Sequence, residues 1–235
     1  MDKNKQISTR LLVLTSALTA MVVVLQLLGS FIRLGVFSIS LVLVPIVIGA
    51  AICGVGAGAW LGFAFGMAVL ISGDAAAFLA IDPVGTVLTV LVKGAAAGLV
   101  SGFVYKGFVK LCDSWKEKFA AKSAHSNSAQ AEEQTKLEKA RELLLKYLPV
   151  VVAAIVCPIV NTGVFLIGCN LFFYDTVATW AAALGYDSAA KYMILGLAGG
   201  NFLFELLFNV LLSPTIVRVL DIFEQHSKKK NFIRQ

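Results

Sequence analysis

The sequence has few charged residues for its length. Charged side chains make up 14% of the 235 residues, whereas a soluble domain carries roughly 25%. The hydrophobic share is 58%, and the apolar residues form long blocks rather than an alternating or helical period. Blocks of about 18 or more apolar residues are typical of membrane spans. The composition therefore excludes a soluble enzyme with one membrane anchor and predicts an all-α integral membrane protein.

Residues that commonly carry catalysis or bind metals are also scarce. The two histidines, His125 and His226, lie in polar segments, and no GxSxG, HExxH or P-loop motif occurs. The four cysteines form no CxxC pair, so neither a disulfide framework nor a zinc site is indicated. We therefore expect no enzymatic activity, no metal and no cofactor. Any ATP-driven role requires a partner protein.

Six segments are apolar enough to cross roughly 30 Å of hydrocarbon, which takes about 20 residues. They are predicted at residues 11–32, 39–54, 55–72, 83–111, 147–173 and 191–222 of one membrane domain that covers 1–235. Glycines around Gly54 are expected to permit a tight turn between the second and third spans. Residues 113–146 are too polar for lipid, and we predict a cytoplasmic loop whose second half is a solvated helix.

Lysine and arginine are distributed unequally between the two predicted faces. With the N-terminus inside, only Arg33 and Lys191 of the 20 basic residues face outside, and Lys93 lies within the membrane. The predicted outer loops carry four acidic residues instead, Asp74, Asp82, Asp175 and Asp187. Because basic residues accumulate on the cytoplasmic side, we predict both termini in the cytoplasm. The basic residues thus orient the chain among lipids and do not indicate nucleic-acid binding.

Small residues recur at every fourth position on two of the predicted spans. They are Gly58, Gly62 and Gly66 on the third span and Gly94, Gly98 and Gly102 on the fourth. Such grooves let another helix backbone approach closely in lipid. One interpretation is packing within the chain, and the other is that the groove on the third span faces a separate membrane subunit. Ser16 and Ala20 give the first span a similar patch, with the same two interpretations.

Two ionisable residues are predicted near the bilayer centre, where a charge costs at least ~2.5–3.5 kcal/mol on insertion scales. Lys93 and Glu205 either pair with each other or contact a polar ligand between helices. Amides and aromatic residues of the last spans join them in a predicted pocket with polar groups and apolar walls. The candidates are Lys93, Asn161, Phe165, Asn170, Asn201, Phe202 and Glu205, with Trp180 as a further wall residue. Gln26 and Asn209 are predicted to serve packing.

Several runs of the sequence resemble the S components of energy-coupling factor (ECF) transporters. They are the run from Phe37 to Ala51, the run from Gly58 to Gly66, Pro83-Val84-Gly85, Lys93-Gly94, the run from Cys157 to Gly163 and the run from Leu212 to Val217. The likeness covers all six predicted spans. The family's AxxxA pattern on the first helix is represented here by Ser16 and Ala20.

The resemblance implies a mechanism that the residues alone do not give. S components bind a vitamin or similar micronutrient on the outer side of the plasma membrane, in bacteria. They then associate with a transmembrane coupling protein and two ABC ATPases, whose hydrolysis of ATP drives release inside. The loop between the first two helices covers the ligand in that family, so Arg33 becomes a candidate contact. The small-residue faces at Ser16, Ala20 and the third span become candidate partner contacts.

The identity of the ligand stays open between two kinds of vitamin. The sequence resembles pantothenate-type and riboflavin-type S components, and the cations Arg33 and Lys93 would suit the carboxylate of pantothenate. The acidic Glu205 argues partly the other way, because it neutralises Lys93 and leaves amides to recognise hydroxyl and amide groups.

Two other classes of function compete with the S component. A solitary proton-coupled carrier is the first, since Lys and Glu inside a membrane relay protons. Such carriers often show inverted repeats with broken helices, and the sequence shows none. A structural or assembly protein, whose polar residues only pack helices, is the second.

Overall fold

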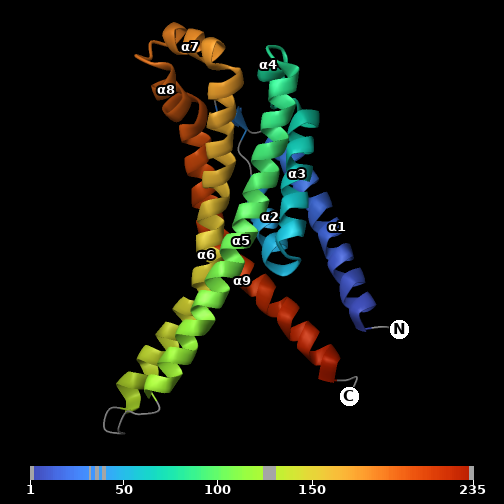
Figure 1. Cartoon of the computed structure of the whole chain (residues 1–235), viewed down its shortest axis with the longest axis vertical. Coiled ribbons are helices and arrows are strands. Elements are labelled where there is room, and N and C mark those ends of the chain that lie inside the picture. The colour runs from blue at the N-terminus through green and yellow to red at the C-terminus, as the bar shows by residue number, and fades with distance from the viewer. Residues whose placement is uncertain (1–2, 32, 35–36, 39–40, 124–130, 233–235) are drawn as a thin grey trace.

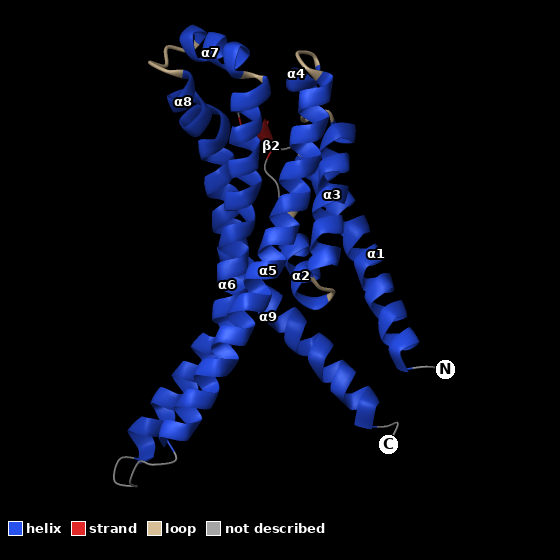
Figure 2. Cartoon of the chain, in the orientation of Figure 1, coloured by secondary structure: helices blue, strands red, loops and turns tan. Residues whose placement is uncertain are grey.

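The computed structural model describes residues 3–31, 33–34, 37–38, 41–123 and 131–232, and nearly all of this part is helical (Figures 1 and 2). Five helical stretches are long and apolar enough to cross a membrane. They are α1 (Lys3–Gly29), α3 (Val55–Ser72), α5 (Pro83–Ser123), α6 (Ala131–Phe172) and a last stretch made of α8 (Ala189–Tyr192), the π-helical η1 (Met193–Gly199) and α9 (Gly200–Phe232). The chain is therefore an all-α membrane protein.

The predicted second span, 39–54, does not form a helix of spanning length. The helix there, α2 (Leu43–Ile52), has 10 residues and a rise of only ~15 Å. The residues before it form a short antiparallel hairpin of β1 (Arg33–Leu34) and β2 (Phe37–Ser38). After it, Gly54 has a φ of 98°, a left-handed conformation that favours glycine, and the chain turns into α3. Hydropathy alone does not reveal that the helix in this segment covers only Leu43–Ile52.

Helix α2 nevertheless belongs to the core of the bundle. Leu43, Ile46 and Val47 on α2 are buried, and they pack with Leu61 of α3 and Ile216 of α9 in one apolar cluster. A helix too short to span the membrane therefore contributes apolar side chains to the core of the bundle.

The glycine groove of α3 is filled by α5 of the same chain. A Cβ atom at Gly62 would overlap the backbone oxygen of Gly94, and one at Gly98 would overlap the backbone oxygen of Gly58. Gly66 likewise faces the backbone of α5 at Val90. The structure therefore shows the first interpretation of the groove, packing within the chain. Gly58, Gly62 and Gly66 are all buried, and they leave no open face there for a separate subunit.

The start of α1, the end of α9, the end of α5 and the start of α6 lie at one end of the molecule (Figure 1). The short helices α4 (Ala76–Leu79) and α7 (Tyr174–Ala183) lie at the other end. The stretch 113–146, predicted as a loop with a helical second half, is helical on both sides of the connection, because α5 runs to Ser123 and α6 begins at Ala131. Its alanine, lysine and glutamate residues are strong helix formers.

Candidate ligand-binding cavity

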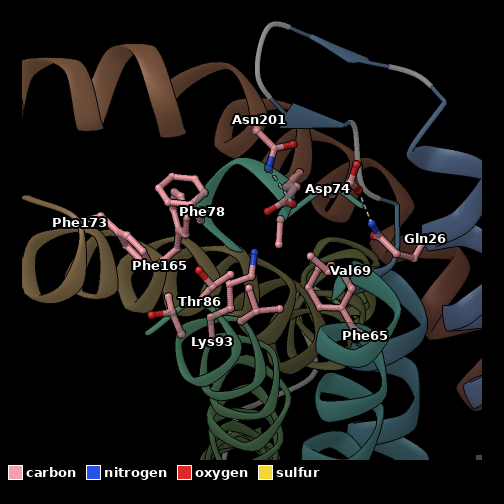
Figure 3. Close-up of a pocket in the computed structure, with 14 residues that line it drawn as sticks. Gln26, Phe65, Val69, Asp74, Phe78, Thr86, Lys93, Phe165, Phe173 and Asn201 are labelled. Atoms are coloured by element: carbon pink, nitrogen blue, oxygen red, sulfur yellow. Dashed lines mark hydrogen bonds between the residues drawn. The ribbon is translucent and has the colours of Figure 1, made fainter. Parts of the chain in front are cut away.

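A cavity lies between the helices in the half of the bundle away from the termini. Its empty space is about 560 Å³, a figure that includes open solvent at its mouth. Helices α1, α3, α4, α5, α6 and α9 all contribute side chains to its wall. Lys93, ten residues into α5, extends into this space (Figure 3). The cavity therefore draws on segments far apart in the sequence.

Glu205 is the centre of a buried polar cluster on one wall. Its side chain is 1% exposed, and its two carboxylate oxygens accept hydrogen bonds from different helices. The Asn161 amide of α6 donates at 3.3 Å, and the Asn201 amide of α9 donates at 3.2 Å. Hydrogen bonds of this kind offset the cost of burying the carboxylate. The structure thus brings together three of the residues that the sequence singled out.

The wall around Asn201 has an unusual helical geometry. The π-helical turn η1 directly precedes Asn201, and π-helical turns are frequent at functional sites because they change which residues face inward. Below it, the Asn209 amide donates at 2.8 Å to the backbone oxygen of Glu205 on its own helix. Asn209 does not line the cavity, in keeping with the packing role predicted for it.

Lys93 places its ammonium group between two aromatic rings. The Nζ atom lies 5.6 Å from the ring centroid of Phe65 and 5.3 Å from that of Phe165. Such cation–π contacts stabilise a desolvated cation by about 0.5–2 kcal/mol each. Lys93 and Glu205 line the same cavity, but among the described residues no ion pair joins them within 4.0 Å. The direct ion pair, one of the two alternatives, is therefore absent from this structure, and both groups line the cavity.

An aromatic cluster forms the end wall of the cavity. Phe78 of α4 meets Phe165, Phe173 and Trp180 edge to face, with centroid distances of 5.8, 4.9 and 5.6 Å. Phe78, Phe165 and Phe173 line the cavity, and Trp180 supports Phe78 from behind. The prediction that Phe165 supplies a wall thus agrees with its position, while Trp180 acts one layer further out.

Four polar residues of the lining were not predicted as site residues: Gln26, Asp74, Thr86 and Thr89. Gln26 of α1 is 2% exposed, lines the cavity and donates to Asp74 Oδ2 at 2.6 Å. Asp74 lies between α3 and α4 and also lines the cavity (Figure 3). Gln26 thus links α1 to the segment between α3 and α4 and also lines the cavity, and the packing role predicted for it stays a prediction. A glutamine inside an apolar span was the available signal, but its partner sits in a loop whose position the sequence does not give.

Two predicted ligand residues, Asn170 and Phe202, do not line the cavity, and Asn161 is linked to it only through its hydrogen bond to Glu205. Asn170 is exposed and lies in a separate groove that Ala190 and Met193 also line. Phe202 is partly buried but does not line the cavity. The side chain of Arg33 lies outside the described part of the structure.

Comparison with known proteins gives one match. No curated protein and no solved structure matches the chain. Residues 10–217 match the model of the family described as ECF transporter, substrate-specific component. The match runs through every helix that lines the cavity. The chain therefore belongs to the family of ECF transporter substrate-specific components and is a membrane transport subunit, not an enzyme.

Proposed function

We propose that the cavity captures a small water-soluble vitamin or related micronutrient from outside the cell. A coupling protein and two ABC ATPases would then drive its delivery to the inside. The observation that carries this proposal is the convergence of Lys93, Asn201 and Glu205 on a cavity with aromatic walls, within the segment that matches the family. Apolar walls with a few convergent polar groups are the usual architecture of a small-molecule site.

The proposed orientation places both termini in the cytoplasm of the plasma membrane. Figure 1 shows the start of α1, the end of α9, the end of α5 and the start of α6 at one end. The polar stretch 113–146 and the C-terminal part of the chain are rich in lysine. Lysine and arginine mark the cytoplasmic face. The cavity, in the opposite half, would then receive its ligand from outside. In this proposal the hairpin and α2 together complete a second crossing between α1 and α3, which gives six crossings.

The first prediction concerns the purified protein. Native mass spectrometry is expected to show one small molecule bound to the chain, because a cavity that buries charged and amide groups is stabilised by a ligand that pairs with them. Reconstituted vesicles are expected to take up that molecule only when the coupling protein and ATPases are present. Uptake driven by a proton gradient in vesicles without any ATPase would contradict the proposal and favour a solitary carrier.

The proposed contact with the coupling protein lies on α1. Ser16 and Ala20 are exposed on this helix, whereas its buried residues Leu18 and Val22 face the bundle. The α3 glycines are covered by α5, so α1 offers the smooth small-residue face that remains open. Close helix contacts in lipid favour such faces.

A bulky side chain on this face is the second test. The Ala20→Phe variant is expected to bind ligand normally but to lose co-purification with the coupling protein by at least about tenfold, since overpacking a helix contact costs ~1–3 kcal/mol. Met21→Phe is the matched control, because Met21 is exposed on the same helix but points about 100° away. Equal co-purification of both variants with the coupling protein would remove α1 from the proposed interface.

A further inference from the structure

Several polar atoms of the cavity lining lack hydrogen-bond partners, and they restrict the chemistry of a ligand that fits there. Lys93 carries three N–H donors, and within the described residues it has ring contacts but no hydrogen-bond acceptor. A buried donor without an acceptor costs free energy unless a ligand or water supplies one. A bound ligand that displaces water from this position would present an acceptor, such as a carbonyl, ring nitrogen or carboxylate oxygen, to the Lys93 ammonium.

The opposite wall presents acceptors. An ionised carboxylate only accepts hydrogen bonds, so the Asn161 and Asn201 amides turn their NH₂ groups toward Glu205. The carbonyl oxygen of Asn201 is then left buried without a partner, as is the hydroxyl of Thr89 across the cavity. The complementary ligand brings N–H or O–H donors to this wall.

The charges of the lining disfavour an anion. The described lining holds one cationic side chain, Lys93, and two acidic ones, Asp74 and Glu205, which is a net charge of minus one when all are ionised. If Glu205 carries a proton, the net charge is zero. Among the described lining residues, neither state offers the excess positive charge that would repay desolvation of a free carboxylate in a medium of low dielectric constant.

The remaining wall is aromatic. Phe65, Phe78, Phe165 and Phe173 supply four rings around the space into which Lys93 extends (Figure 3). Aromatic rings prefer to stack on or meet edge to face with other rings, at ~0.5–1.5 kcal/mol beyond the area that they bury. An aliphatic ligand would gain free energy from burial of its apolar surface but would lack these ring–ring contacts.

From these features we infer that the ligand is a planar aromatic molecule without net negative charge that carries both hydrogen-bond acceptors and hydroxyl or amino donors. The inference rests on the proposed capture function and narrows it. Of the two kinds of vitamin that the sequence leaves open, the riboflavin type fits this description and the pantothenate type, an aliphatic carboxylate, does not. The acceptor of the ligand would face the Lys93 ammonium, and its donors would face the unpaired carbonyl oxygen of Asn201.

A panel of probes on the purified full-length protein tests the inference. Riboflavin and pyridoxine serve as uncharged aromatic probes, and pantothenate and biotin serve as carboxylate probes. Their affinities are measured by thermal shift and calorimetry, and any molecule that copurifies is identified by mass spectrometry. At least one aromatic probe is expected to bind about tenfold or more tightly than either carboxylate, and any copurified molecule is expected to be aromatic and not anionic.

A charge variant provides the second measurement. Asp74→Asn removes one negative charge but keeps an acceptor for Gln26. It is expected to strengthen pantothenate binding several-fold through weaker repulsion. Asp175→Asn is the control, because Asp175 lies on α7 outside the lining, and it should change no affinity.

The possible results distinguish failure of the aromatic ligand class from failure of the proposed capture function. Preference of the wild-type protein for a carboxylate probe, or an anionic copurified molecule, overturns the aromatic class and leaves vitamin capture intact. Absence of any copurified molecule, together with no stabilisation by any probe, overturns the capture function and the class with it.

Discussion

Replacing Gly62 with alanine is expected to prevent stable packing of the bundle. The new Cβ would overlap the backbone oxygen of Gly94 on α5, and a backbone atom yields only if the whole helix moves. Overpacking of this kind costs ~1–3 kcal/mol and more where no side chain can rotate away. We expect a loss of monodisperse protein in detergent, or a large drop in its unfolding temperature.

Gly163→Ala on α6 is the matched control. A Cβ at Gly163 meets nothing within 4 Å, and alanine has the higher helix propensity, so this variant is expected to be as stable as the wild type or slightly more stable. The pair also separates the two interpretations of the α3 groove. If the groove served only a separate subunit, Gly62→Ala would fold and bind ligand normally and would fail only in assembly. Equal unfolding temperatures for both variants would therefore contradict packing within the chain.

The parts of the fold that depend on local composition could be predicted from the sequence. The long apolar stretches of α3 and α5 begin at Val55 and Pro83, as the hydropathy pattern indicated, because lipid imposes length and apolarity on each spanning helix. The cluster of Asn201 and Glu205 could also be predicted, since residues four apart share one helix face.

The parts that depend on which segments meet could not be predicted in the same way. A glycine groove looks the same whether it receives α5 or another protein, so the role of Gly62 required the neighbouring helix. The hydrogen bond between Gln26 and Asp74 joins residues 48 positions apart, and both residues line the cavity. Asn170 illustrates the opposite case, because its depth on α6 suited a ligand site but its direction did not.

Loss of the Lys93 ammonium group is expected to have the largest effect on ligand binding. A hydrogen bond to a charged group contributes about 1.5–3 kcal/mol, so Lys93→Met should weaken binding of the copurified ligand about 10- to 150-fold. Methionine has a similar length and makes favourable contacts with aromatic rings, so Phe65 and Phe165 keep a neighbour and the fold is retained. Lys106→Met, an exposed lysine on the same helix, is expected to change nothing.

The effect of Lys93 is separable from that of Glu205 by a double-mutant cycle. Glu205→Gln keeps the size of the side chain, but one of its two amide partners, Asn161 or Asn201, then faces an NH₂ group instead of an oxygen. This variant is expected to lower both the unfolding temperature and the affinity for ligand. If the two residues meet through the ligand, coupling appears in the binding free energy and is weak in the unfolding free energy without ligand. Strong coupling in unfolding together with unchanged ligand affinity would assign Lys93 and Glu205 a purely structural role.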